Sequence, residues 1–188
     1  MNGNLAYQKE IWEETLNGKI YLMSPRPLIN HNRIAFNISM AFHHYLKGKT
    51  CETFSDGVDV HLTENDCVIP DAMIVCNRDI IKRDGIYGAP DLIVEVLSPS
   101  TAKNDRGYKK NLYEKSGVKE YWIVIPETRS VEVYLLNNGT YELDDVYSIF
   151  PEEIKLTEED KALYKDEVKV SLYDDFSIPL DEIFDRLF

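Results

Sequence analysis

The sequence of 188 residues contains only three cysteines and no long apolar run. Because a membrane-spanning helix needs about 18 consecutive apolar residues or more, none is expected. The first 19 residues lack a basic start followed by an apolar stretch, so no secretion signal is expected. Cys51, Cys67 and Cys76 are too few and too loosely spaced for a disulfide framework or a CxxC zinc site, and each is predicted to be a buried small hydrophobic residue. A reducing cytoplasm is therefore the predicted location.

Several motifs of well-known catalytic and nucleotide-binding sites are also absent. Neither GxxxxGKS/T nor GxGxxG occurs, which excludes phosphate-binding loops of those two kinds. HExxH is missing, and the adjacent His43 and His44 would point to different sides of a helix, so a zinc protease site of that type is excluded. The Gly-x-Ser-x-Gly turn that carries a nucleophilic serine is missing too.

The composition is that of an ordinary globular protein, with 44% apolar and 29% charged residues. It excludes a disordered chain, a collagen-like repeat and a coiled-coil rod. At roughly 100–200 residues per domain, the length predicts a single domain over residues 1–188. The last part of the chain, about residues 151–188, has 12 acidic and 5 basic residues and is predicted to be an acidic C-terminal extension.

The net charge of −12 argues against a nucleic-acid-binding protein, because such proteins usually carry a basic face. The charge is unevenly distributed, however. Residues 99–119 carry six basic and two acidic side chains. The position of this basic segment must therefore be known before nucleic acid is excluded.

Hydrophobic periodicity predicts two principal helices, over residues 31–46 and about 103–116. In the first, Ile34, Ile38 and Phe42 recur at a spacing of four and form one apolar face. Shorter helices are expected to end near Leu16, before a turn at Asn17-Gly18, and to begin at Pro179. Gly117 is predicted to end the second principal helix.

Alternating or continuous apolar residues predict the strands. They fall over residues 20–22, 52–62, 67–76, 91–97, 121–125, 131–136 and 168–172. The strand over 91–97 is the most hydrophobic and is expected to be central, and residues 91–125 should form a strand–helix–strand crossover with parallel strands. The predicted fold is therefore α+β, with a central mixed sheet of about five to seven strands flanked by helices.

Two acidic residues interrupt apolar strands. Glu95 lies inside Leu-Ile-Val-Glu-Val-Leu, and Asp71 follows Pro70 in another apolar stretch. A buried carboxylate is costly unless it has a partner. On neighbouring strands the two acids could share a divalent ion such as Mg²⁺ or Mn²⁺, and without it their repulsion should raise one pKa. The alternative is structural: Glu95 pairs with a lysine or arginine, and Asp71 caps a turn.

The helix that follows Glu95 carries the remaining chemistry. Asp105, Lys109 and Tyr113 are spaced i, i+4 and i+8 and should share one helix face, so that Lys109 reaches back toward Glu95. Two carboxylates and a lysine suit metal-assisted phosphodiester hydrolysis. The neighbouring basic residues would then offset DNA phosphates, although a solvated helix face is the alternative. They are Lys103, Arg106, Lys110, Lys115 and Lys119.

The combination of these motifs resembles a known family. The motifs are Pro70-Asp71, the run Asp91–Thr101, the residues Asp105, Lys109 and Tyr113, the segment Gly117–Val124, and Glu14, Gly18, Met23-Ser24-Pro25 and His31. Together they resemble the Uma-two family of small restriction endonucleases, within the PD-(D/E)XK nuclease superfamily. The resemblance runs from about residue 10 to residue 136 and is most specific over residues 89–124.

This resemblance implies a restriction-endonuclease-like core, magnesium as the cofactor and DNA as the substrate. Asp71 and Glu95 would bind the metal. The lysine that usually lies two positions after the second acid is replaced by Leu97, and Lys109 would be the matching catalytic residue. Supporting roles in ordering the site or contacting the phosphate would fall to Glu14, His31, Ser98, Asp105 and Tyr113, and DNA contacts to Lys103, Arg106 and Lys110.

The leading hypothesis is thus a metal-dependent endonuclease that hydrolyses DNA. A catalytically silent nuclease-fold protein that binds nucleic acid or protein is the main alternative. A structural domain in which Glu95 is a paired core acid, and a different metal-dependent hydrolase, are the others. Cleavage specificity and oligomeric state stay open, with a homodimer suggested only by analogy with enzymes that cut both strands.

Overall fold

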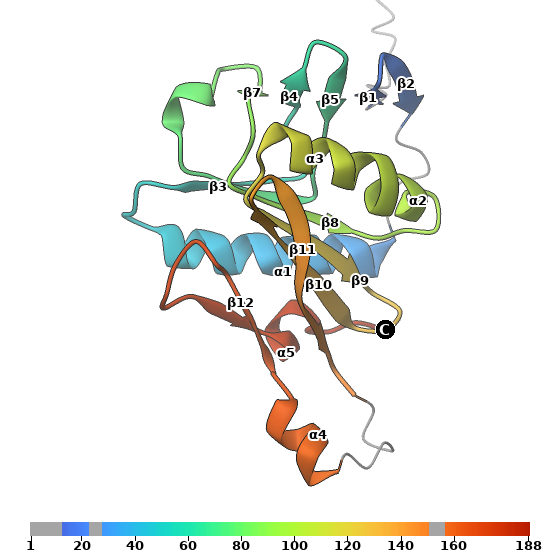
Figure 1. Cartoon of the computed structure of the whole chain (residues 1–188), viewed down its shortest axis with the longest axis vertical. Helices are drawn as coiled ribbons and strands as arrows, with labels where there is room; N and C mark the ends of the chain where they lie inside the picture. The colour runs from blue at the N-terminus through green and yellow to red at the C-terminus, as the bar shows by residue number, and fades with distance from the viewer. Residues whose placement is uncertain (1–12, 23–27, 151–156) are drawn as a thin grey trace, which may run out of the picture.

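The computed structural model describes residues 13–22, 28–150 and 157–188. Its largest element is a six-stranded sheet with the strand order β11-β10-β9-β8-β6-β3 (Figure 1). β8 and β9 run parallel, and the other neighbouring pairs are antiparallel, so the sheet is mixed as predicted. The strands are β3 Glu52–Ser55, β6 Ala72–Val75, β8 Leu92–Val96, β9 Glu120–Ile125, β10 Ser130–Asn137 and β11 Thr140–Ser148.

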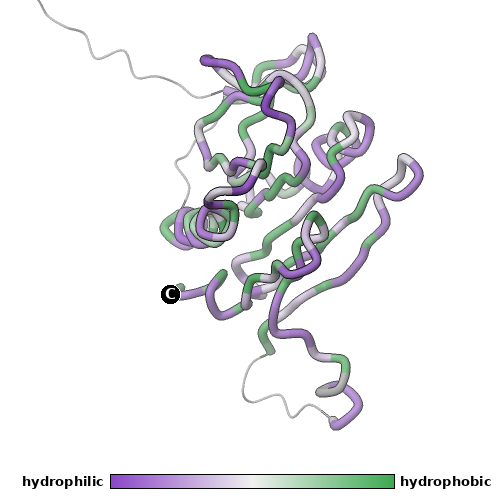
Figure 2. Tube along the Cα trace, turned by 90° about the vertical axis from the view of Figure 1, so that its left-hand side faces the viewer, coloured by the Kyte–Doolittle hydropathy of each residue, from purple (hydrophilic) through white to green (hydrophobic). Residues whose placement is uncertain are grey.

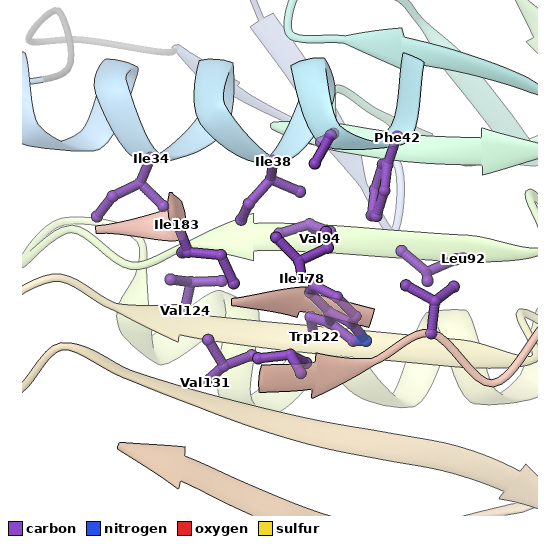
Figure 3. Close-up of a cluster of buried hydrophobic side chains, with 14 of the residues drawn as sticks. Ile34, Ile38, Phe42, Leu92, Val94, Trp122, Val124, Val131, Ile178 and Ile183 are labelled. Carbon is purple, nitrogen blue, oxygen red and sulfur yellow. The ribbon is translucent and has the colours of Figure 1, made fainter. Parts of the chain in front are cut away.

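One face of this sheet is covered by helix α1, Ile29–Leu46, as the periodicity predicts. Ile34, Ile38 and Phe42 are fully buried and face Val94 and Trp122 of the sheet (Figure 3). Each such side chain contributes about 1.5–3 kcal/mol by leaving water. Among the described residues, no helix combines the length and the apolar character that a membrane crossing requires.

The same face is also covered by the end of the chain. Strands β12 Glu167–Lys169 and β13 Ser177–Pro179 pair, and the short helix α5 Leu180–Ile183 follows. Val168, Ile178 and Ile183 belong to the same buried cluster as α1. This part of the chain therefore buries its apolar residues against the sheet, and most of its acidic residues are exposed to solvent. Figure 2 shows hydrophilic residues at many of the peripheral turns of the chain.

The opposite face carries the smaller sheet and a helical segment. The smaller sheet has the order β2-β1-β5-β4-β7 and lies at the top of Figure 1. Its strands are β1 Glu13–Leu16, β2 Lys19–Leu22, β4 Val60–Thr63, β5 Asp66–Val68 and β7 Ile86–Tyr87. The helical segment consists of α2 Ala102–Asn104, the π-helical η2 Asp105–Lys109 and α3 Lys110–Ser116. Two further short helices are η1 Arg78–Ile80 and α4 Glu158–Leu163.

Strand β8 lies inside the large sheet, so both of its faces are buried. Leu92, Val94 and Val96 point toward α1, and Ile93 points toward the smaller sheet and α3. By the two-residue period of a strand, Glu95 shares the face of Ile93. The sheet thereby aims this carboxylate at the helical segment that follows β8.

The predicted helix over residues 103–116 is present, but its middle is not α-helical. Residues Asp105–Lys109 form a π-helical turn, a feature often found at functional sites. Gly117 ends the segment with φ 86°, the left-handed conformation that glycine adopts without strain. The α+β prediction and the parallel pairing of β8 with β9 are confirmed.

The prediction of a short helix ending near Leu16 was wrong. Residues Glu13–Leu16 form strand β1, which pairs with β2 across the turn at Asn17-Gly18. Glu14 and Leu16 point inward and are buried, so the period is two rather than 3.6. The predicted strand 52–62 is likewise divided, because Asp56-Gly57 breaks it into β3 of one sheet and β4 of the other.

The cysteine prediction was wrong for two of the three residues. Cys51 and Cys76 form a disulfide between the start of β3 and the end of β6, which are antiparallel neighbours. Cys67 in β5 is a free, half-buried thiol. A spacing of 25 residues gave no local signal for this bond, which depends on strand pairing.

Glu120 links the large sheet to the C-terminal segment. Its carboxylate accepts hydrogen bonds from Trp122 Nε1 at 2.6 Å, and from the backbone nitrogen and hydroxyl of Ser171 at 2.9 and 2.5 Å. Burial raises the pKa of this carboxyl from 4.5 to about 7, although these hydrogen bonds oppose the rise. The folded protein therefore binds the proton more tightly than the unfolded chain between these two pH values.

The contribution of Glu120 to the free energy of unfolding should consequently be greatest below about pH 4.5. It should fall by about 3 kcal/mol as the pH rises to about 7. Urea unfolding of the wild type and of Glu120→Gln across this range measures the effect. The stability of the variant relative to the wild type should increase by that amount, because an amide does not titrate. A constant difference between the two proteins would contradict the raised pKa.

Candidate active site

Acidic groups meet at the end of β8. Glu95 is buried, with 4% of its surface exposed, and Asp71 lies just before β6. Residues Ala72 and Val94 are paired across β6 and β8, and extending this register by one residue places Asp71 opposite Glu95. The backbone nitrogen of Val96 donates a hydrogen bond of 2.7 Å to Asp71 Oδ2. The strand pairing thus brings together the two acids that the sequence singled out.

The buried ammonium group of Lys109 lies among three carboxylates. Lys109 Nζ is 2.9 Å from Glu95 Oε1, 2.8 Å from Glu14 Oε1 and 3.5 Å from Asp105 Oδ1. Only 2% of Lys109 is exposed. The lysine therefore reaches back to Glu95, as its position on the helix predicts.

Two tyrosines complete the interior side of this cluster. Tyr113 donates its hydroxyl to Glu95 Oε1 at 2.6 Å, and Tyr121 donates to the backbone oxygen of Asp105 at 3.0 Å. Their rings meet edge-on, with centroids 5.1 Å apart. Burial and the charge of Glu95 hold both phenol pKa values well above the ordinary value, so the hydroxyls stay protonated and act as donors. They fix the orientation of Glu95 and of the π-helical turn.

Glu14 reaches the cluster because the smaller sheet is anchored to the helical segment. Glu14 Oε1 also accepts a 2.9 Å hydrogen bond from the backbone nitrogen of Ile69. Asp66 accepts from Asn17 N at 2.7 Å, in the turn after β1, and from the Tyr108 hydroxyl at 2.7 Å. Asp66 therefore ties the hairpin that carries Glu14 to the helical turn that carries Lys109.

Negative charge is in excess around Lys109. Burial raises the pKa of Glu95 well above its ordinary value; Lys109 opposes this rise, and Asp105, Asp71 and Glu14 add to it. Burial alone would lower the pKa of Lys109, but the charges of Glu95, Glu14 and Asp105 outweigh burial and raise it. These carboxylates therefore favour the protonated form of the lysine. The predicted rise of one carboxyl pKa is present in Glu95, with burial as its main cause.

His31 and Asp56 lie on the other side of Asp71. His31 Nε2 is 3.4 Å from Asp71 Oδ2. Burial lowers the pKa of His31, but the hydrogen bond to Asp71 and the charges of Asp71 and Asp56 raise it overall. Partial desolvation and the charge of Asp71 raise the pKa of Asp56. Sequence reasoning missed Asp56, because Asp56-Gly57 reads only as a turn.

The remaining predicted residues lie outside this cluster of contacts. The Ser98 hydroxyl interacts within its own loop, 3.0 Å from the hydroxyls of Ser100 and Thr101. Arg106 contacts both carboxylate oxygens of Glu132 at 2.8 and 3.0 Å. Two further basic residues are also engaged: Lys110 Nζ lies 3.4 Å from the centre of the Tyr134 ring, and Lys119 pairs with Asp91 at 2.8 Å. Lys103 is exposed on α2.

The donor set fits a hard divalent cation. Carboxylate oxygens are the ligands of Mg²⁺ and Mn²⁺, and Mg²⁺ commonly uses only one or two of them together with water. The hydrogen bonds of Asp71 with described residues use Oδ2, and those of Glu95 use Oε1, which leaves Oδ1 and Oε2 for a metal. Within the described part of the chain, Asp105 Oδ2 and His31 Nδ1 also have neither a hydrogen-bond partner nor an ion-pair partner. Such orphaned polar atoms are costly unless a further group satisfies them.

Comparison with known proteins agrees with this fold. The family model Uma2, described as "Putative restriction endonuclease", matches residues 5–162. An uncharacterized protein of Synechocystis sp. is 32% identical over 128 residues, and the match covers 67% of this chain and 66% of that protein, so the chain spans about two thirds of its relative's length. A crystal structure from Anabaena variabilis, titled "a putative nuclease belonging to DUF820", superposes with a TM-score of 0.64 and 18% identity over 92% of this chain and 89% of that one. At this identity the last match supports the fold alone.

The geometry predicts unequal stability effects for substitutions at the two partners of the buried ion pair. Lys109→Met leaves Glu14, Glu95 and Asp105 without their cation and should lower the free energy of unfolding by about 3–5 kcal/mol. Glu95→Gln keeps an acceptor for Tyr113 and Lys109 and removes one of several repelling charges. Its stability should stay within about 1 kcal/mol of the wild type.

Urea unfolding in the presence of a chelator, at neutral pH, measures both variants. A loss in Glu95→Gln as large as that in Lys109→Met would contradict the charge excess. In that case Glu95 would be an ordinary structural acid whose main partner is Lys109.

Proposed function

Because the chain belongs to the Uma2 family, we propose that it is a metal-dependent endonuclease that hydrolyses the phosphodiester bonds of DNA. One observation carries this proposal: Glu95, Glu14 and Asp105 gather around Lys109 at the end of a central strand, and Asp71 lies opposite Glu95 on the neighbouring strand. An excess of carboxylates in a buried place is unfavourable unless a further cation binds. The family description supports a nuclease as the reason for this arrangement.

In this proposal Asp71 and Glu95 hold Mg²⁺ or Mn²⁺ through their remaining oxygens. A bound metal of this kind lowers the pKa of water and neutralises charge on the phosphate. Asp71 is held for this role by Val96 N and His31, and Glu95 by Lys109 and Tyr113. Fixed carboxylates need no rearrangement to accept the ion, which favours binding.

Lys109 would stabilise negative charge rather than remove a proton. Its three carboxylate neighbours raise its pKa and outweigh the opposing effect of burial, and this net rise favours the protonated form. An ammonium group 2.9 Å from Glu95 is suited to interact with a phosphate oxygen or a water bound beside that acid. The helical segment thus supplies the positive charge that is missing at position 97, where this chain has leucine instead of the usual lysine. Asp105 would position Lys109 rather than touch the substrate.

DNA would approach along the helical segment 102–116. Lys103 offers an exposed positive charge there, whereas Arg106 is balanced by Glu132 and Lys110 lies over Tyr134. Lys103, Arg106 and Lys110 are the proposed DNA contacts, and Arg106 would exchange Glu132 for a phosphate.

The packing of residues 167–184 into the core supports one nuclease domain for residues 1–188. A homodimer would allow cleavage of both strands. The disulfide between Cys51 and Cys76 removes the cysteine argument for a reducing cytoplasm, because such bonds persist mainly in oxidising surroundings.

The second candidate is a nuclease-fold protein that binds nucleic acid or protein without cleaving. The engaged state of Arg106 and Lys119 and the net charge of −12 favour it, because they weaken attraction to phosphate. Metal binding separates the two candidates. Only the nuclease requires an ion between Asp71 and Glu95.

Titration calorimetry with Mg²⁺ or Mn²⁺ should give binding to the wild type and none to Asp71→Ala. Cleavage of plasmid DNA in the same buffers should fall by about 100-fold or more in Asp71→Asn and Glu95→Gln, because each removes a charged metal ligand. Asp181→Asn, an exposed acid on α5, is the matched control and should retain both activities. If the wild type binds no metal even with DNA present, the nuclease proposal fails and the binding protein becomes the better account.

DNA affinity should depend on the basic residues of the helical segment. With Ca²⁺ in place of Mg²⁺ to suppress cleavage, Lys103→Ala should weaken binding and reduce the slope of log K against log salt by about 0.9. Glu132→Gln should strengthen binding because it releases Arg106. Fluorescence anisotropy at several salt concentrations measures both, with Lys47→Ala at the far end of α1 as the control. An unchanged slope in Lys103→Ala would place the DNA path elsewhere.

A further inference from the structure

A second group of metal-binding residue types occurs in the smaller sheet. Asp59 precedes β4 and His61 lies within it, two residues apart, so they share one side of the strand. Cys67 of β5 is the direct cross-strand partner of His61. The pairing of β4 with β5 therefore gathers a carboxylate, an imidazole and a thiol from a short stretch of sequence.

These three side chains face away from the acidic cluster around Lys109. Val60 and Val68, the alternating neighbours of His61 and Cys67, are fully buried in the core with Leu16. His61 and Cys67 consequently project from the opposite side of the smaller sheet. The group is half-buried to exposed and is accessible to solvent ions.

The geometry around the group is already organised for a ligand. One donor atom from each of Asp59, His61 and Cys67 lies within 4.8 Å of the others. The His61 ring stacks on Tyr87, with centroids 4.4 Å apart and an interplanar angle of 18°. Strand β7 and the residue after it hold the backbone of β4 in place. Ile86 N donates a hydrogen bond of 2.8 Å to the Asp59 backbone oxygen, and Gly88 N donates one of 3.0 Å to the His61 backbone oxygen.

Gly85 allows the chain to close over this group. A Cβ atom at position 85 would lie 2.8 Å from the backbone oxygen of Asp59 and 3.5 Å from His61 Cδ2. Only glycine permits this close approach, so the loop before β7 packs directly against two of the three residues. The side chains are thereby restrained by their surroundings instead of being free on an exposed strand.

We propose that Asp59, His61 and Cys67 form a second metal site, selective for Zn²⁺ over Mg²⁺. Thiolate and imidazole ligands suit zinc, whereas magnesium requires oxygen. Three protein ligands leave one position of a tetrahedron for water or an external ligand. Binding replaces the proton of the Cys67 thiol, which passes to the buffer.

The site has a structural consequence for the neighbouring strand. Cys67 also pairs with Thr15 of β1, next to Glu14. A metal that joins β4 to β5 would therefore stiffen the sheet from which Glu14 reaches Lys109. The proposal does not depend on nuclease activity, because none of its ligands belongs to the acidic cluster.

Cobalt titration of the full-length chain tests the proposal directly. Co²⁺ bound to a thiolate gives a charge-transfer absorption band that carboxylate ligands do not give. The wild type should show this band, saturating at one equivalent, and added Zn²⁺ should abolish it. Glu95→Gln should behave like the wild type, which separates this site from the acidic cluster. No reductant is added, so Cys51 and Cys76 remain bonded to each other.

Cys67→Ser is the matched variant, because it keeps the shape of the side chain and the other two cysteines. It should lose the band, and His61→Ala and Asp59→Asn should weaken Zn²⁺ binding at least tenfold in competition with a chromophoric chelator. Far-UV circular dichroism verifies that each variant is folded, and Cys67→Ala replaces Cys67→Ser if the latter is not. Absence of the band from the wild type, or its persistence without Cys67, would overturn the proposal.

Discussion

The buried ammonium group of Lys109 holds together three segments that are distant in the sequence. It contacts Glu14 from the smaller sheet, Glu95 from the central strand and Asp105 from its own helical turn. Because a buried carboxylate without a cation is strongly unfavourable, these elements can pack closely only while the lysine is present. Three further features place these groups around the Lys109 nitrogen atom. They are the π-helical turn, the hydroxyls of Tyr113 and Tyr121, and the hydrogen bonds that Asp66 accepts from Asn17 and Tyr108.

One lysine does not balance the acids that surround it. Burial raises the pKa of Glu95, and the charges of Asp105 and of Asp71, on the neighbouring strand, raise it further. The site therefore combines oxygen atoms of the kind that hard divalent ions prefer with an excess of negative charge. Buried carboxylates that repel one another lower the stability of the fold. Such a loss of stability is common at functional sites. Membership of the Uma2 family agrees with a nuclease as the function served.

The basic residues outside the site are largely engaged within the folded chain. Residues 99–119 are basic in sequence, yet Arg106, Lys110 and Lys119 each have a partner in the folded chain. In the proposed nuclease, attraction to DNA would depend on exchanging these partners for phosphates, which would make binding weaker than the number of lysines suggests. The smaller sheet has two separate faces, with Glu14 on one and the group of Asp59, His61 and Cys67 on the other.

The sequence by itself determined the local features. Periodicity defined α1 and β8, the i, i+4, i+8 spacing placed Asp105, Lys109 and Tyr113 on one face, and an acid within an apolar strand identified Glu95. Only the tertiary structure decided the contacts between distant segments. It made residues Glu13–Leu16 a strand, joined Cys51 to Cys76, paired Arg106 with Glu132 and brought His61 beside Cys67. The physical reason is that strand pairing and charge neutralisation depend on which segments meet in space, and a short window of sequence carries no record of that partner.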